Sequence, residues 1–450
     1  MKLRVICMFT LLTASIPFYA QDNEGKKSWT LEDCINYALE KNIQLQQDKI
    51  SLQESEIDIK DARASLFPTL SFSTGHNMVN RPYQEQSATV SGTEIISSND
   101  KTTYNGNYGL NAQWTLWNGG KRLYNLKQQK TNRDIAQLSV SETENMLQEQ
   151  IAQLFIQILY ADESIRINKG TLEVSEATYQ RGKELFNEGS ISKADLAHLE
   201  AQVSNDKYQV VSAESSLRNY KLQLKQLLEL DGTEEMDLIL PQLDNEDVMK
   251  LLPSQTDIYQ TALAIRPEIQ SGRLSIENAK LGISAAKSGY YPTISLSASS
   301  SSTTNSASTN NWAQQMKYGW NNMIGINLSI PIFDNRQNKS NVQKAKLQYN
   351  TSQLELVNKQ KELYSTIESL WLDALNAQQQ YAAAETKVKS SQTSFDMVSE
   401  QFNLGMKNTV ELLTEKNNLL SAKQELVQAK YMAILNRTLL NFYAGNNIEL

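Results

Sequence analysis

An internal repeat is the feature that most restricts how this 450-residue chain can fold. The segment Ser65–Ser71 (SLFPTLS) returns in the second half of the chain as Gly289–Ser295 (GYYPTIS). Likewise, Phe186–Gly189 (FNEG) returns at nearly the same offset as Phe402–Gly405 (FNLG). In each copy the residue pattern predicts a helix, two alternating strands and a very long helical hairpin. Neither copy can bury its apolar faces alone, so we expect the two copies to pack against each other.

The first residues have the pattern of a secretory signal peptide. Lys2 and Arg4 precede a mostly apolar run that ends at Ala20, and this run is too short to be a spanning helix. We therefore expect an exported protein. The predicted organisation in chain order is a signal peptide at 1–20, a first copy at 21–230, a linker at 231–254 and a second copy at 255–450.

The side chains that most protein chemistry requires are scarce. The formal net charge is −7 and the basic residues are scattered, which is unlike the footprint of a nucleic-acid-binding protein. Cys34 is the single cysteine after the predicted signal peptide, so no intramolecular disulfide is expected. His76 and His198 lie far apart in the sequence, and no cluster has metal-ligand spacing. We expect no enzyme, no metal site and no cofactor.

Four segments alternate apolar and polar residues with a period of two, which is typical of half-exposed strands. In the second segment Leu110, Ala112 and Trp114 fall on one face, and small or polar residues fall on the other. The predicted strands cover about 69–79, 107–117, 291–299 and 322–332. The segments between paired strands, 78–105 and 300–320, are rich in Ser, Thr and Asn and are expected to be long exposed loops.

Helices of unusual length follow each strand pair. Residues 121–187 and 334–403 contain no proline, and at 1.5 Å per residue either helix would reach about 100 Å. Apolar positions recur at spacings of four and three from Leu147 to Phe186, and again from Leu363 to Phe402, which is the coiled-coil pattern. The returning helices of the two hairpins are expected at about 193–229 and 409–443.

A shorter helix is expected ahead of each strand pair. Thr30 and Asp33 have the spacing of a capping box, which predicts a helix from there to about residue 64, before Pro68. The matching helix of the second copy is expected at about 256–288, before Pro292.

The number of strands implies that several copies of the chain assemble. Four strands cannot close on themselves, since the smallest membrane barrels need about eight. An open sheet with one apolar face in lipid would leave the backbone groups of its edges unpaired. We therefore expect the strands to be shared between at least two copies. The alternative is a soluble antiparallel sheet that caps a coiled coil.

The duplicated plan, the Trp117–Gly120 exit from the second strand and the turns at 187–192 and 403–408 resemble the TolC-type outer-membrane efflux protein family. The resemblance covers residues 30–445. It implies a mixed α and β membrane protein, a homotrimer whose 12-stranded β-barrel continues into a periplasmic α-helical coiled-coil tunnel. It also implies an exit duct of a tripartite efflux or type I secretion machine. Its partners would be outer-membrane lipid, a periplasmic adaptor (membrane fusion) protein and an inner-membrane pump.

The same resemblance assigns roles to residues at the two hairpin turns. It places the turns at the periplasmic end, where the adaptor docks. The residues that would form these docking tips are Gly189, Ser190, Ile191, Ser192, Gly405, Met406, Asn408 and Thr409. It also implies a periplasmic gate formed by Phe402, Lys407, Glu411 and Asp195. A further acidic position of the family is Thr414 here, with Glu415 beside it, which departs from the pattern.

Simpler interpretations of these residues and of the whole chain stay open. Gly189 and Gly405 suit tight helical turns, and Lys407 and Glu411 are spaced to form an ion pair on one helix surface. The alternative function is a lumenless structural coiled-coil protein of the cell envelope. Only a duct needs four alternating segments joined to a duplicated hairpin. The choice between drug efflux and protein secretion belongs to the pump and the adaptor.

Overall fold

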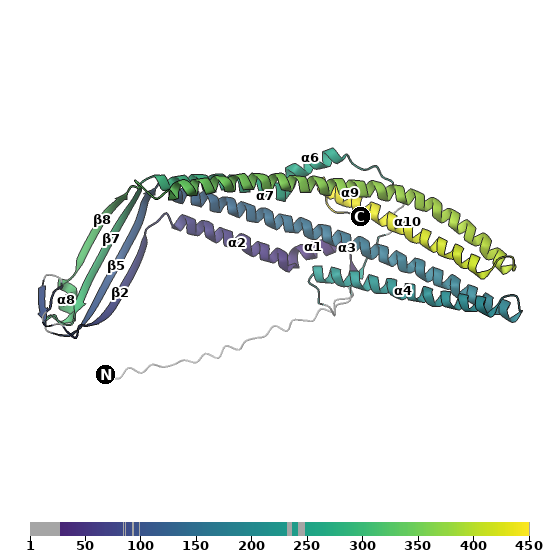
Figure 1. Ribbon diagram of the computed structural model, residues 1–450, viewed down its shortest axis with the longest axis horizontal. Helices are drawn as coiled ribbons and strands as arrows, with labels where there is room; N and C mark the ends of the chain where they lie inside the picture. The colour runs from purple at the N-terminus through teal and green to yellow at the C-terminus, as the bar shows by residue number, and fades with distance from the viewer. Residues whose placement is uncertain are drawn as a thin grey trace, which may run out of the picture.

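The computed structural model describes residues 28–449, except for 84, 86, 92, 93, 99, 232–235 and 242–247. The predicted signal peptide at 1–20 lies outside the described residues. The molecule is elongated, with a four-stranded sheet at one end and the tips of two helical hairpins at the other (Figure 1). Within the described residues, no helix is both long enough and apolar enough to cross a membrane.

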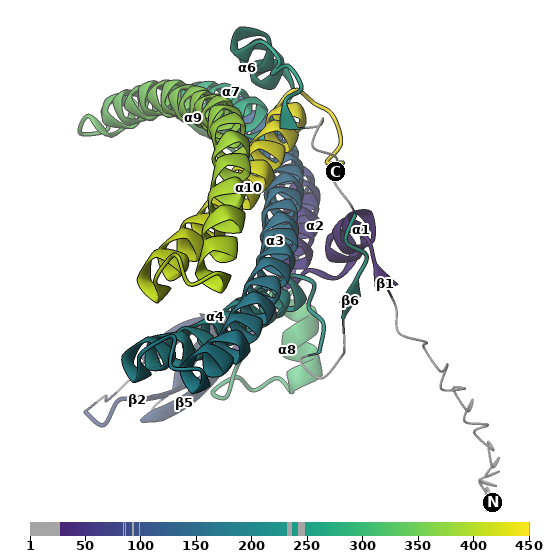
Figure 2. The ribbon, with the colours of Figure 1, turned by 90° about the vertical axis from the view of Figure 1, so that its right-hand side faces the viewer.

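A layer of long helices forms the body of the molecule. Far from the sheet, each copy contributes one hairpin, α3 with α4 and α9 with α10 (Figure 1). Nearer the sheet, the neighbouring helices follow the order α2, α3, α7, α9. Viewed from the tips, the layer is curved (Figure 2). Four short elements lie on one side of it: α1 (Leu31–Lys41), β1 (Ser28–Trp29), β6 (Asp237–Leu238) and α6 (Gln255–Ile265). The bounds are α2 (Ile43–Ala64), α3 (Lys121–Asn187), α4 (Lys193–Leu227), α7 (Pro267–Lys287), α9 (Gln337–Asn403) and α10 (Thr409–Tyr443).

The helix that precedes the strands is broken in both copies, which the prediction of one continuous helix missed. Thr30 and Asp33 form the expected capping box at the start of α1 (Leu31–Lys41), but that helix ends at Asn42. The Asn42 side chain accepts a hydrogen bond from the N–H of Leu45 and so caps α2 as well. Asn42 also donates to the Leu227 carbonyl oxygen (3.1 Å), which fixes the break against α4.

The second copy breaks at the equivalent position of the repeat, Arg266. The predicted helix over 256–288 is divided there into α6 (Gln255–Ile265) and α7, and a short 3₁₀ turn, η1 (Ser288–Tyr290), follows. Pro267 occupies the first position of α7, where its missing N–H would have no helical partner in any case. The first helix of each copy therefore ends for a different reason: Asn42 acts through its side-chain hydrogen bonds, and Pro267 through its ring and missing N–H.

The four long strands pair antiparallel in the order β2, β5, β7, β8, so the contact between β5 and β7 joins the two copies. Their bounds are β2 (Thr69–Asn80), β5 (Thr102–Asn118), β7 (Thr293–Asn305) and β8 (Asn321–Ser329). The register places Phe72 opposite Leu110, and Leu296 opposite Ile326. The predicted apolar face is thus continuous across the sheet, and most of its large side chains are exposed in a single copy.

The predicted ends of the strands and the predicted loops need correction. β5 begins at residue 102 and β7 continues to 305, whereas β8 ends at 329, two residues before Pro331. The segment expected to be a loop at 78–105 contains a hairpin of β3 (Ser87–Ser91) and β4 (Glu94–Ser98). The segment at 300–320 contains α8 (Trp312–Tyr318). Ser, Thr and Asn fill both faces of the outer strand ends, which hides the period of two.

Both long helices begin with left-handed residues. Gly119 and Gly120 have φ of 68° and 83° ahead of α3. The equivalent residues of the second copy, Asn335 and Arg336, have φ of 51° and 69°, so α9 begins at 337 instead of the predicted 334. This turn redirects the chain from strand to helix in both copies.

The largest apolar cluster lies midway along the helices and contains residues of both copies. Ile151, Phe155 and Ile158 of α3 pack together with Ile434 and Leu435 of α10. Most of the predicted heptad positions are buried, but Phe186 is exposed and its neighbour Leu185 is buried instead. The linker between the copies contributes β6 (Asp237–Leu238), which pairs parallel with β1 (Ser28–Trp29) beside this cluster. Each copy therefore supplies part of the core of the other.

Candidate functional site

The two hairpin tips are built in the same way. At each tip the long helix ends in a Schellman motif, with a glycine in the left-handed region: Gly189 has φ of 77° and Gly405 has φ of 72°. The N–H of Ser190 donates to the Leu185 carbonyl oxygen (2.7 Å), and the N–H of Met406 donates to that of Gln401 (2.8 Å). A Cβ added to either glycine would meet no atom within 4 Å, so the positive φ alone is the reason for glycine.

A capping box starts the returning helix at each tip. The Ser192 hydroxyl accepts from the N–H of Asp195 (3.1 Å), and Asp195 accepts from the N–H of Ser192 (3.2 Å). Asn408 and Glu411 make the same reciprocal pair at α10, at 2.9 and 3.2 Å. The caps of α4 and α10 are thus formed by residues that the family resemblance assigned to docking and gating: Ser192, Asn408, Asp195 and Glu411.

Hydrogen bonds stabilise the charged form of both capping carboxylates. The Ser192 hydroxyl is the main cause that holds the pKa of Asp195 below its ordinary value. For Glu411, the Lys407 ammonium at 2.5 Å and then the N–H of Asn408 lower the pKa of the carboxyl. Because both pKa values are depressed, these interactions are intact above the ordinary carboxyl range and are lost as the pH falls through the lowered values. The ion pair between Lys407 and Glu411 is therefore present at neutral pH.

Residues of the tips divide into an exposed set and a buried set. Met406 is 71% exposed, and Ser190 and Gly189 are also exposed. By contrast, Phe402 is 2% exposed and Thr409 is 1% exposed. The Thr409 side chain is thus covered within one copy and is not part of the exposed surface of the tips.

An apolar cluster joins the two hairpins at the tips. Phe402 of α9 packs there with Leu185 of α3, Leu199 of α4 and Leu412 of α10. Ile191, which was expected on the docking surface, is partly buried against this cluster. Within one copy, Phe402 is thus a packing residue.

The sequence did not reveal a buried cluster of charged and polar residues farther from the tips. Lys416 of α10 makes an ion pair with Asp206 of α4, and their side chains are 5% and 2% exposed. The Lys416 ammonium also donates to Ser175 of α3, whose hydroxyl donates to Asp206 (2.5 Å). Gln202 donates to the other carboxylate oxygen of Asp206 (2.9 Å). Burial lowers the pKa of Lys416, and the contact with Asp206 opposes that shift.

This cluster tied to Lys416 is part of a polar stretch between the two hairpins. Two turns farther along, Gln424 of α10 donates to the buried Asn168 of α3 (3.2 Å). Asn168 and Ser175 are the polar positions of the first heptad seam, and this was the only sequence signal for the stretch. The contact between α3 and α10 is therefore apolar near the middle of the molecule, polar over this stretch, and apolar again at the tips.

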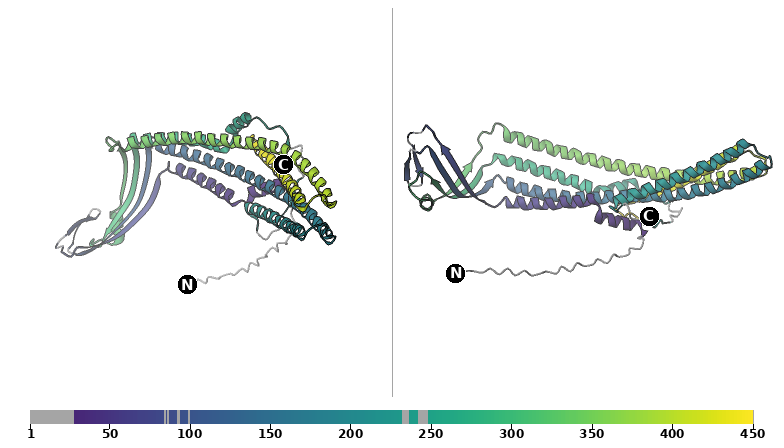
Figure 3. Two further views of the ribbon diagram at one scale, coloured as in Figure 1. Left: turned by 45° about the vertical axis from the view of Figure 1, so that its right-hand side comes forward. Right: turned by 90° about the horizontal axis from the view of Figure 1, so that it is seen from below.

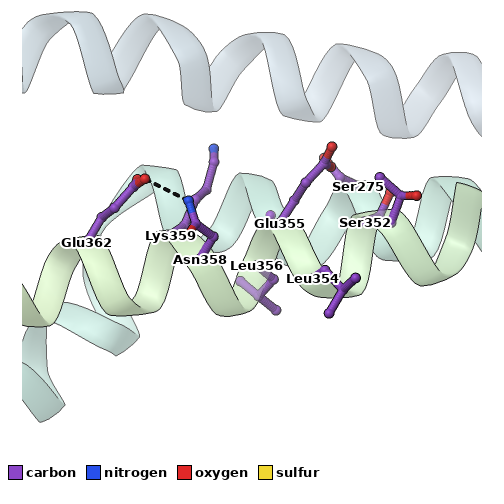
Figure 4. Close-up of a pocket in the computed structure, with 10 residues that line it drawn as sticks. Ser275, Ser352, Leu354, Glu355, Leu356, Asn358, Lys359 and Glu362 are labelled. Atoms are coloured by element: carbon purple, nitrogen blue, oxygen red, sulfur yellow. Dashed lines mark hydrogen bonds between the residues drawn. The ribbon is translucent and has the colours of Figure 1, made fainter.

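An open groove of about 590 Å³ lies along α7 and α9, toward the sheet. Glu355, Lys359 and Glu362 project from α9 on one side, and Asn358 donates to Glu362 (2.7 Å; Figure 4). These are ordinary solvated groups of a helix surface, and none of them belongs to the tips. Among the residues that the structure describes, no group of three or more His, Cys, Asp or Glu side chains could hold a metal ion.

Removing one charge of the ion pair between Lys416 and Asp206 should destabilise the fold strongly, whereas removing both charges should destabilise it little. In Lys416→Met or Asp206→Leu one charge stays buried without its partner, so we expect a loss of about 3–5 kcal/mol in the free energy of unfolding. The double variant Lys416→Met/Asp206→Leu should recover most of that loss. Circular dichroism during denaturation of the purified protein measures both effects.

The exposed pair between Lys387 and Glu425 (2.8 Å) is the matched control for that experiment. Lys387→Met should change the free energy of unfolding by no more than about 1 kcal/mol, because exposed ion pairs contribute little. Single variants of the buried pair that behave like this control would contradict a structural role for the cluster.

Comparison with known proteins gives matches along nearly the whole described chain. Residues 34–229 and 258–446 match the family of outer membrane efflux proteins, as two segments that correspond to the two copies. Outer membrane protein TolC of Escherichia coli is 24% identical over 299 residues, which cover 64% of this chain and 58% of TolC. The alkaline protease secretion protein AprF of Pseudomonas aeruginosa is 23% identical over 427 residues, covering 92% of this chain and 84% of AprF.

The fold also matches solved structures over most of its length. The crystal structure of the outer membrane protein VceC from Vibrio cholerae superposes with a TM-score of 0.77 at 16% identity, covering 93% of this chain and 97% of VceC. The sheet and the paired hairpins therefore belong to one shared architecture.

Proposed function

Because the chain belongs to the outer membrane efflux protein family, we propose that it forms the outer-membrane exit duct of a tripartite efflux or secretion machine. In this proposal the chain is a homotrimer that spans the outer membrane and extends into the periplasm. A periplasmic adaptor and an inner-membrane pump deliver the substrate, and the duct conducts it passively. The proposal assigns the chain no catalytic residue and no cofactor.

The main support for this proposal is that, in a single copy, the sheet and the helical layer each have two uncovered sides. Among the described residues, β2 and β8 are the edge strands of the sheet, and each leaves one row of backbone groups without a partner strand. The same sheet exposes an apolar face that includes Phe72, Leu110 and Ile326. In lipid, unpaired edges are costly, so β8 of one copy should pair with β2 of the next. Such head-to-tail pairing closes into a ring.

The helical layer repeats this arrangement, since α2 and α9 lie at its two sides. Ile43, Ile50 and Ile57 recur every seven residues along α2, and each is more than half exposed. On α9, Leu347 and Leu354 are likewise exposed and seven residues apart. Two heptad stripes on opposite sides of one protomer suit knobs-into-holes packing between copies. Three copies would then give 12 strands and a closed helical tunnel.

The second face of the sheet favours a duct over a lumenless coiled coil. Facing away from the apolar side, the strands carry mostly small or polar residues and no charged one; examples are Ser73, Asn111, Ser297 and Asn327. Several of these groups bond within the sheet, such as the Asn111 amide to the Ser73 hydroxyl (3.2 Å). A face of this kind requires contact with water, which a wet lumen provides and a packed interior does not.

Substitution of adjacent residues tests which face of the sheet meets lipid. Leu110→Arg or Ile326→Arg should impair assembly, because arginine near the bilayer midplane on a lipid face costs about 2–4 kcal/mol. The matched controls Asn111→Arg and Asn327→Arg place the same charge on the polar face and should assemble far better. The yield of detergent-extracted trimer measures the difference. Equal tolerance on the two faces would show that the sheet does not face lipid.

The exposed residues of the tips test the proposed docking of an adaptor. Figure 3 shows both tips together at the end of the molecule opposite the sheet. Ser190→Trp and Met406→Trp should abolish export and crosslinking to the adaptor while leaving trimer yield unchanged, because both side chains are exposed. Ser216→Trp, on an exposed position far along α4, is the control. Normal export by the tip variants would show that docking occurs elsewhere.

The proposed gate can be tested without disturbing the helix cap. Glu411→Gln keeps a capping-box side chain but removes the charge, so it should weaken block of the channel by divalent or trivalent cations. Lys407→Ala should raise the conductance of the channel in a planar bilayer. Lys387→Ala, on the exposed part of α9, should change neither property. If Glu411→Gln and Lys407→Ala also change neither, the pair at the tip is only a surface ion pair.

A further inference from the structure

The helix α8 lies where the sheet is farthest from the long helices (Figure 1), and aromatic side chains gather around it. The Trp312 indole N–H donates to the Tyr108 hydroxyl (3.3 Å), and their rings meet edge to face at 6.1 Å. The His76 ring also meets the Tyr108 ring edge to face, at 5.4 Å. Trp312, Tyr318 and Trp320 are each more than half exposed. Trp320 lies just before the predicted strand at about 322–332, and Tyr108 near the start of the one at about 107–117. Trp312 and Tyr318 fall in the segment that was expected to be a loop.

Hydrogen bonds fix α8 to one identified face of the sheet. The Ser302 hydroxyl donates to the Met316 carbonyl oxygen (3.1 Å), and Ser302 lies directly opposite Tyr108. Tyr108 is two residues from Leu110 on β5, so both side chains lie on the same face. The Gln315 side chain of α8 also accepts from the N–H of Asn305 (2.7 Å). The helix therefore lies on the apolar face of the sheet and not on its polar face.

The distance between two aromatic groups on this face is close to the height of the apolar band of a membrane barrel. Trp117 pairs with Ile294 at the end of β5 nearer the helices, whereas Tyr108, which accepts the hydrogen bond of Trp312, pairs with Ser302. The two groups are thus eight residues apart along β7, from 294 to 302. Eight residues at 3.3 Å, in a strand tilted by about 40°, span about 20 Å along the membrane normal, against about 25 Å for the apolar band of an outer-membrane barrel.

We propose that α8 is an interfacial element that contacts the outer leaflet of the membrane. The Trp312, Tyr318 and Trp320 rings lie at the boundary between acyl chains and headgroups, where aromatic residues with one polar atom are favoured. The exposed Lys317 ammonium is placed to meet the phosphates of lipid headgroups. The apolar band and the two aromatic groups then fix the depth of the sheet in the bilayer. This inference rests on the proposed function, since it needs the apolar face to meet lipid.

Spin labels at single cysteines measure the depth of each position directly. In a Cys34→Ala background, nitroxide labels are attached to Tyr318→Cys, Ile326→Cys and Asn327→Cys in the full chain, reconstituted in lipid vesicles. Power saturation then compares the access of oxygen, which enriches in lipid, with the access of a nickel chelate, which stays in water. We expect position 326 to be deep in lipid, position 327 to be in water and position 318 to lie at the interface between them.

The outcomes separate this inference from the proposed function. A label at position 318 that is as accessible to the nickel chelate as the label at 327, while 326 remains in lipid, overturns the role of α8 alone. Water access at both 318 and 326 overturns the lipid-facing sheet and the inference with it. If Tyr318→Cys does not assemble, Trp320→Cys replaces it, because that side chain belongs to the same exposed group.

Discussion

Most of this structure depends on how the chain covers its unpaired strand edges and its exposed apolar helix faces. An unpaired strand edge in lipid and an exposed apolar stripe in water are both unfavourable. A single chain has a strand edge and an apolar stripe on each of its two sides. Duplication solves half of this problem, because β5 pairs with β7 and the two copies share one core. It leaves the outer edges of β2 and β8, and the stripes on α2 and α9, open in a single chain. In the proposed trimer, neighbouring copies would cover them.

The parts of this fold that could be predicted are those with a long, uninterrupted period. The seams from Leu147 and from Leu363 predicted the two longest helices, and the alternation around Leu110 predicted the sheet and its apolar face. Family resemblance added the position of the tips. Shorter features gave weaker signals. Asn42 breaks a helix through two hydrogen bonds of a single side chain, and α8 has only seven residues within a polar segment.

The candidate site was predictable only in part, because contacts across the two copies leave little trace in sequence. Ser175 and Asn168 appeared as irregularities in the seam, but nothing in the sequence paired them with Lys416 and Gln424 of the second copy. A buried polar cluster lowers stability relative to an apolar one, yet it can fix the register of packed helices. Here it lies between two apolar clusters, where a shift of α10 along α3 would bury Lys416 without Asp206.

At the tips, a helix cap and a gate need not be separate roles for Glu411. A residue in the third position of α10 must lie at the end of the helix, and its carboxyl, whose pKa is lowered further by the Lys407 ammonium, is charged at neutral pH. In a ring of three copies these carboxylates repel one another more strongly as the mouth narrows. A narrow mouth therefore needs a cation close to each carboxylate. The Lys407 ammonium is already placed there, so the surface ion pair would itself reduce the repulsion between the carboxylates of a closed mouth.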